Sequence, residues 1–240
     1  MKKLLSVYFL LLSLTGTGTE KSVHVQLPVD SVPGSKHKAV RPIDAKSFIL
    51  PGSLIGVGAI LTFTNSNLDS LVQDEITQEL PGFHTGLDNV LMVAPAVAVF
   101  GLNAAGVKGK NNLLHATEYY LTALLISLGT SEILKKVIHV ERPDQSGNNS
   151  FPSGHTTNAF MGAEFLHQEY GHRSGWYTAA GYTTATATGL LRMANNKHWL
   201  GDVIAGAGIG ILSTRFSYWL IPRINKALHK EKAPAPVLKF

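Results

Sequence analysis

Cysteine is absent from this 240-residue chain, and charged residues make up only 15% of it. Without cysteine there are no disulfides, thiolate metal ligands or cysteine nucleophiles, so the fold depends on packing alone. The low charge, together with 45% hydrophobic residues, excludes a disordered chain. Aromatic residues are few, at 8%, and the net charge is only +5, which argues against nucleic acid as a partner.

The amino terminus has the pattern of an export signal. Lys2 and Lys3 precede an apolar run over residues 4–14, and small residues follow up to Thr19. This order predicts a secretory signal peptide over residues 1–19, because an apolar run of 11 residues is too short to span a bilayer, which takes about 20. Residues 20–46 are polar and contain three prolines, as expected of a linker or a loosely docked arm.

The rest of the chain alternates apolar stretches with polar connections. Small residues recur every four positions at Gly181, Ala185 and Gly189, and again at Gly206 and Gly210, as on closely packed helices. We therefore predict an all-α bundle of about six helices, membrane-embedded or membrane-associated, over residues 47–222, followed by a basic tail over 223–240. The predicted helices cover residues 48–63, 90–107, 119–134, 156–166, 177–191 and 203–221.

The mean hydropathy argues against six membrane-spanning helices, whereas the charges of the loops argue for them. The runs 48–63, 90–107 and 203–221 are candidate spans, although a mean hydropathy of +0.10 is low for six crossings. Residues 65–89 carry acidic and no basic side chains, and we expect them to be a solvated face; the following connection and the tail are basic. This alternation favours six spans with a cytoplasmic tail. It conflicts with an exported amino terminus, which would place the segment after the third helix in the cytoplasm.

Two blocks of residues suit an anionic ligand. Lys135 and Arg142 are seven residues apart, about two helical turns, so they can project from one face before Pro143 stops the helix. Taken alone, such a basic helix end is as typical of a solvated surface. In the second block Ser153 can cap the next helix, and Gly154 lets backbone N–H groups approach a phosphate. His155 follows directly.

A third block joins the last two predicted helices. It contains Arg192, His198 and Asp202. If the segment is helical, His198 and Asp202 share a face, and the carboxylate can accept a hydrogen bond from one ring nitrogen. That bond would set the tautomer and leave the other nitrogen free to attack.

Together the three blocks resemble the type 2 phosphatidic acid phosphatase superfamily, which includes bacterial non-specific acid phosphatases and vanadium haloperoxidases. Its signature is K-x6-R-P, P-S-G-H and S-R-x5-H-x3-D, and the spacing within each block is intact here. One position departs from it, because Leu191 stands where the family has serine.

The resemblance implies a role for each matching residue. His198 would be the nucleophile that forms a phosphohistidine, Asp202 would orient it, and His155 would be the general acid and base. The remaining matching residues would bind the phosphate oxygens, and no metal or other cofactor is expected. These phosphate-binding residues are Lys135, Arg142, Ser153, Gly154 and Arg192.

The family resemblance defines the type of reaction more closely than it defines the substrate. Our first interpretation is a metal-independent phosphatase acting on an envelope lipid: lipid A, phosphatidylglycerol phosphate, phosphatidic acid or a polyprenyl pyrophosphate. The alternative is a soluble periplasmic acid phosphatase of broad specificity, and a vanadate-dependent haloperoxidase is a third reading. The predicted signal peptide and the resemblance to the family both imply a site that faces the periplasm. The protein would then belong to the inner membrane or the periplasm of a bacterium.

Overall fold

The computed structural model describes residues 43–64 and 67–230, and the regular structure in these ranges is entirely helical. The predicted signal peptide and nearly all of the predicted linker lie outside the described residues. The expectation of an all-α bundle is confirmed. The elements are η2 (Ala45–Phe48), α1 (Ile49–Phe63), α2 (Leu68–Glu79), α3 (Leu87–Leu91), α4 (Ala94–Ala104), α5 (Leu113–Ile138), α6 (Gly154–Tyr170), α7 (Gly175–Ala194) and α8 (Leu200–Lys230).

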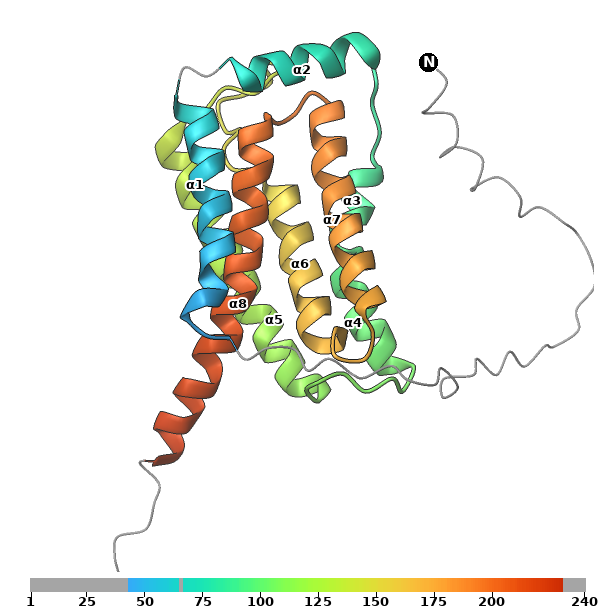
Figure 1. Cartoon of the computed structure of the whole chain (residues 1–240), viewed down its shortest axis with the longest axis vertical. Coiled ribbons are helices and arrows are strands. Elements are labelled where there is room, and N and C mark those ends of the chain that lie inside the picture. The colour runs from blue at the N-terminus through green and yellow to red at the C-terminus, as the bar shows by residue number, and fades with distance from the viewer. Residues whose placement is uncertain (1–42, 65–66, 231–240) are drawn as a thin grey trace, which may run out of the picture. The chain divides into compact units, whose positions relative to one another are not determined.

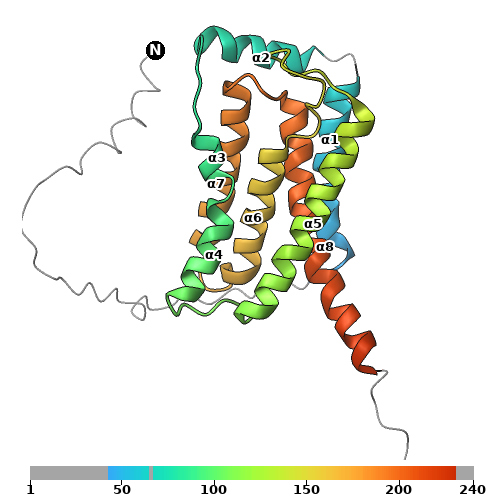
Figure 2. The same ribbon diagram turned by 180° about the vertical axis from the view of Figure 1, so that it is seen from behind.

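Helix α6 is the centre of the bundle. It contacts α3, α4, α5, α7 and α8, and twelve of its seventeen residues are buried. Figure 1 shows α6 behind α7 and α8, and Figure 2 shows it from the other side between α4 and α5. Helix α1 lies along α8, and α2 crosses one end of the bundle (Figure 1). Residues at the first turn of α6 are therefore surrounded by helix ends.

Small residues allow the helices of this centre to approach closely. A Cβ atom on Gly210 would lie 2.3 Å from the carbonyl oxygen of Thr157, and one on Gly206 would lie 2.8 Å from the carbonyl oxygen of Ser153. Such distances are far shorter than a normal contact between heavy atoms. The predicted small face of α8 is therefore a backbone-to-backbone contact with α6, beside the second sequence block.

One predicted helix is divided in the structure, and one observed helix was not predicted. The run 90–107, a candidate span in the sequence, is broken at Met92 and Val93 into α3 and α4, and α4 is an apolar helix of 11 residues. Helix α2 was not predicted, because it alternates polar and apolar residues and a search for long apolar stretches passes over it.

The acidic segment is also not simply a solvated face. Asp69 on α2 is buried, and its Oδ1 accepts a 2.9 Å hydrogen bond from the backbone N–H of Gly201 in the first turn of α8. A carboxylate is favourable there because the first N–H groups of a helix lack intrahelical partners. Gln73, one turn later, donates to the carbonyl oxygen of Met193 and to Asn196 Oδ1. Helix α2 thus ties together the corner between α7 and α8.

Two of the described helices are long and apolar enough to cross a membrane by length and composition: Ala45–Phe63 and Leu200–Leu228. Only 11% of the first is buried in the bundle, against 67% of the second. Ile49, Ile60 and Phe63 each expose more than half of their surface, as expected of an apolar face that meets lipid. Helix α8 continues through Pro222, so the predicted boundary between domain and tail falls inside a helix; that division stays a prediction.

Candidate active site

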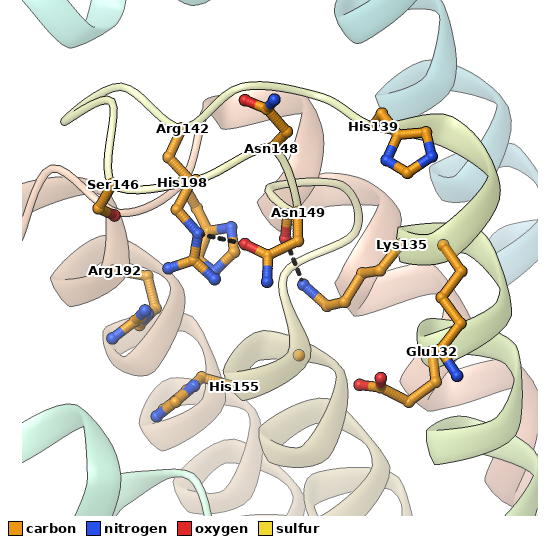
Figure 3. Close-up of a pocket in the computed structure, with 13 residues that line it drawn as sticks. Glu132, Lys135, His139, Arg142, Ser146, Asn148, Asn149, His155, Arg192 and His198 are labelled. Atoms are coloured by element: carbon orange, nitrogen blue, oxygen red, sulfur yellow. Dashed lines mark hydrogen bonds between the residues drawn. The ribbon is translucent and has the colours of Figure 1, made fainter.

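A cavity of about 800 Å³ lies at the end of the bundle where α5, α6 and α7 meet the α7–α8 corner. Six of the eight predicted site residues line it, from all three sequence blocks, and Figure 3 shows five of them labelled around one space. The other two predicted residues, Ser153 and Asp202, do not line the cavity and are fully buried. The six lining residues are Lys135, Arg142, Gly154, His155, Arg192 and His198.

Hydrogen bonds between two loops bring the blocks together. Asp144 in the α5–α6 loop donates its backbone N–H to the carbonyl oxygen of Asn196, and its carboxylate pairs with Lys197. Trp199 Nε1 donates to the carbonyl oxygen of Glu141 over 2.7 Å. Because these bonds join residues more than 50 positions apart, they hold the first and third blocks around the start of α6.

Lys135 and Arg142 converge, but not as members of one helix. Helix α5 ends at Ile138, and His139 takes up a left-handed conformation with φ of 50°, so Arg142 lies in the loop and the expected shared helical face is wrong. Both cations instead reach Asn149: Lys135 Nζ donates to its backbone oxygen over 2.7 Å and Arg142 Nε to its Oδ1 over 2.8 Å (Figure 3). Each of the two cations thus forms a hydrogen bond to an oxygen atom of Asn149.

His198 and Asp202 also meet differently from the expectation. His198 precedes α8, which begins at Leu200, so the two residues do not share a helical face. Asp202 Oδ2 lies 3.5 Å from His198 Nδ1 and accepts hydrogen bonds from Ser150 Oγ and from the backbone N–H of Trp199. Ser150 Oγ is itself 3.4 Å from His198 Nδ1. The carboxylate and the serine both face Nδ1, which leaves Nε2 for chemistry.

The second block begins α6 as predicted. Ser153 is the N-cap residue, with its Oγ 2.9 Å from Thr156 Oγ1, and Gly154 is the first helical residue. The Ser153 side chain is therefore engaged within the helix start and does not line the cavity. His155 lines the cavity, and its Nε2 lies 2.7 Å from Asn89 Oδ1 on α3.

Four neighbours of the motif residues were not found from the sequence. Asp88 on α3 is fully buried and forms a 2.7 Å ion pair with Arg192. Asp88 and Asn89 precede the first block by more than 40 positions, and no pattern around them marks them. Asn149 and Ser150 directly precede the second block. The sequence therefore places them near the site, but it does not indicate which side chains they contact. Leu191, at the position where the family has serine, lies outside the lining of the cavity.

The electrostatics suit an anion. Burial lowers the pKa of Lys135 to about 8, and repulsion from Arg142 adds to the effect. Burial likewise lowers the pKa of His198 to about 4, although Asp202 opposes the shift, so the imidazole is neutral at pH 7. The pKa of His155 is lowered by burial and then by Arg192. A cavity that brings three motif cations together with a neutral buried imidazole can bind a phosphate and present a nitrogen lone pair to it.

Residues 117–226 match the model of the PAP2 superfamily. This region contains all three sequence blocks, so this part of the chain carries the sequence pattern of that superfamily.

Two curated relatives share part of the chain. One is a lipid A 1-phosphatase of Porphyromonas gingivalis, 36% identical over 168 residues, which are 68% of this chain and 36% of the relative. The other is the bacitracin transport permease protein BcrC of Bacillus licheniformis, 36% identical over 78 residues, which are 32% of this chain and 36% of the relative. The matches thus span about a third of each relative's length.

Two solved structures are similar at low identity. The crystal structure of LpxE from Aquifex aeolicus has a TM-score of 0.49 and 22% identity, and the match covers 65% of this chain and 98% of the other. A transmembrane PAP2-type phosphatidylglycerolphosphate phosphatase from Bacillus subtilis has a TM-score of 0.46 and 20% identity, with 75% and 97% covered.

Proposed function

We propose that this chain is a phosphatase that hydrolyses a phosphate monoester of an envelope lipid through a phosphohistidine. The observation that carries the proposal is the convergence of the three cations and two histidines of the sequence blocks on one cavity. Phosphoryl transfer depends on positioned positive charge, because negative charge is spread over the equatorial oxygens in the transition state. Lys135, Arg142 and Arg192 would supply that charge.

The first half of the reaction uses His198. Its Nδ1 faces Asp202 and Ser150, so its Nε2 attacks phosphorus and forms the P–N bond as the bond from phosphorus to the lipid oxygen breaks. His155 donates a proton to that leaving oxygen. Asp202 stabilises the positive charge that His198 acquires.

The second half releases phosphate. A water molecule gives a proton to the now neutral His155 and attacks phosphorus, and the P–N bond breaks to return its electron pair to His198. The products are the dephosphorylated lipid and inorganic phosphate. Before substrate binds, Asn149 occupies Lys135 and Arg142; two phosphate oxygens would take the place of its two oxygens.

Three observations support a lipid as the substrate and a membrane as the setting. Helix α1 directs large apolar side chains outward, α8 is long enough to span a bilayer, and one relative is named for lipid A. The acidic helix α2 lies at the end of the bundle near the α7–α8 corner (Figure 1), whereas the far end of α8 carries Arg223 and Lys226. By the positive-inside rule the site would face the periplasm.

The test is phosphate release by the purified full chain in detergent, with a chelator present and no added metal. Mixed micelles of lipid A or phosphatidate are compared with a soluble aryl phosphate, and the variant His198→Gln serves as the blank. We expect release from a lipid that exceeds release from the aryl ester. Efficient turnover of the aryl ester alone would favour the soluble acid phosphatase, and no release above the blank from any substrate would refute the proposal.

A further inference from the structure

Helix α3 contributes to the site from outside the region that matches the family. Asn89 on this helix precedes residue 117, where that region begins, yet its Oδ1 lies 2.7 Å from Nε2 of His155. It is the one hydrogen-bond partner of the His155 ring within the described part of the chain. Asn89 is therefore placed to orient the imidazole, provided that its own backbone is held.

That backbone position is firmly held. The neighbouring residue Asp88 is fully buried in its ion pair with Arg192. Just before α3, Thr85 exchanges two 2.9 Å hydrogen bonds with the side chain of Asn195, at the end of α7. The five-residue helix is thus anchored just before its first turn and within it, and Asn89 projects from an anchored segment although its own side chain is exposed.

We propose that Asn89 is the positioning residue of His155: its carboxamide oxygen holds a proton on Nε2 and so makes Nδ1 the nitrogen that exchanges protons in the cavity. This inference rests on the proposed function for the reaction that His155 serves. A carboxamide oxygen accepts a hydrogen bond and carries no proton to give, so the Nε2–H form of the neutral ring is favoured.

The consequence for catalysis is a ring with one committed and one free nitrogen. In the charged form both nitrogens carry protons, and Nδ1–H can be donated to the leaving oxygen. After the transfer Nε2–H stays on Asn89, and the lone pair of Nδ1 is ready to take the proton of the attacking water. The ring need not flip between the two half-reactions, because the same nitrogen gives and receives the proton.

Asn89 also affects how readily His155 is charged. A hydrogen bond to its oxygen is stronger from the imidazolium than from the neutral ring, so Asn89 raises the pKa of His155 against burial and the nearby cations, which lower it. Asp88 favours the charged form as well. The other charged or titratable groups that face His155 are Arg192 on α7, Lys135 on α5, Arg142 in the α5–α6 loop and His198 before α8.

The direct test is NMR of the full chain in detergent with ¹⁵N-labelled histidine, with the His155 signals assigned by their loss in His155→Gln. We expect the wild-type neutral ring to be the Nε2–H tautomer. Asn89→Ala should mix the tautomers and lower the pKa of His155 by about half to one unit, whereas Asn89→Asp should raise it. Asn67→Ala, at an exposed asparagine whose side chain makes no capping bond, is the matched control and should change neither.

Turnover of an alkyl phosphate against pH gives the second readout. Activity requires protonated His155, so the alkaline limb of kcat should move to lower pH in Asn89→Ala and to higher pH in Asn89→Asp. A purely structural role would lower activity in both variants without opposite shifts. An unchanged His155 tautomer and pKa in both variants would overturn the inference. The expected NMR shifts in a chain that releases no phosphate would support the inference and refute the proposed function.

Discussion

His198 is the side chain on which the proposed chemistry most depends. Replacing it with glutamine keeps a side chain of similar volume in the buried position but removes the nucleophilic nitrogen. We expect His198→Gln to lower turnover by at least about a thousandfold and to retain no phosphate on the protein after an alkaline quench, which preserves phosphohistidine. His115→Gln, at an exposed histidine paired with Glu118, is the control. Near-normal phosphate release by His198→Gln would remove the nucleophile assignment.

Lys135 gives the site a second pH dependence. Its pKa of about 8 is below that of an ordinary lysine, mainly because the ammonium is buried. The charge is therefore largely present at pH 7 and is lost as the pH rises through 8, which weakens the attraction for a phosphate dianion. We expect the inhibition constant of inorganic phosphate, measured with an aryl phosphate, to rise above pH 8 by at most about tenfold per pH unit.

Lys135→Arg provides the complementary result. A guanidinium keeps its charge to much higher pH, so the weakening above pH 8 should disappear in this variant, whatever its basal activity. Lys136→Arg, one position further along and also at the cavity, should leave the break at pH 8 in place. A break at pH 8 that persists in Lys135→Arg would show that another group causes it.

Asp88 is the buried partner of a cation that the reaction needs. Asp88→Asn would leave the Arg192 guanidinium, itself largely buried, without a counter-charge, and such a loss typically costs about 3–5 kcal/mol. We expect a lower denaturation midpoint in detergent together with weaker phosphate binding, whereas Asp74→Asn, on the exposed face of α2, should match the wild type. Wild-type stability in Asp88→Asn would mean that the ion pair contributes little.

The sequence could identify the motif residues but not their partners. Lys135, His155 and His198 were predicted because spacing within a block is a local property of the chain. The contact of Asp88 with Arg192 joins residues 104 positions apart, and nothing local marks such a pair. Even the pairing of His198 with Asp202 was predicted for the wrong reason, because the start of α8 could not be placed to within two residues from sequence.

The helix contacts around the site depend on glycine. A methyl group on Gly210 would overlap the backbone of α6 at Thr157 and Met161, and neither backbone can move without shifting the first turn of α6. We expect Gly210→Ala to lower both stability and turnover. Gly129→Ala, on α5, where a Cβ would meet nothing within 4 Å, should instead stabilise the protein by about 0.5–1 kcal/mol. Equal effects of the two substitutions, measured by thermal denaturation, would contradict the close packing.

Helices were predictable where their apolar faces are long. The predicted runs 48–63 and 203–221 lie within the observed α1 and α8, give or take one residue, because packing and insertion both select such runs. Helix α2 was not predicted and α3 was joined to α4, because the important contacts of both helices are polar. Asp69 and Gln73 bind backbone groups at the α7–α8 corner, and Asp88 binds the guanidinium of Arg192. Side chains chosen for such single bonds leave no periodic pattern in the sequence.

The length of α8 relates the site to the bilayer. The helix begins two residues after His198, and from Leu200 to Lys226 it rises about 39 Å at 1.5 Å per residue. The hydrocarbon core of a bilayer is about 30 Å thick. If α8 spans the membrane, the cavity and the basic end of α8 therefore lie at opposite surfaces. Trp219, with the Arg223 guanidinium 4.1 Å from its ring centre, has the character of an interfacial anchor.

The absence of cysteine allows this topology to be tested with single introduced thiols. Glu79→Cys lies at the exposed end of α2, and Lys226→Cys lies near the far end of α8; the parent chain has no thiol to give background labelling. In spheroplasts treated with a membrane-impermeant maleimide, we expect Glu79→Cys to be labelled at once and Lys226→Cys only after permeabilisation. Labelling of both before permeabilisation would indicate a periplasmic protein that does not span the membrane, and labelling of Lys226→Cys alone would place the site in the cytoplasm. The first two patterns place the catalytic cavity on the periplasmic side and the third on the cytoplasmic side, so the orientation decides which leaflet supplies the lipid phosphate.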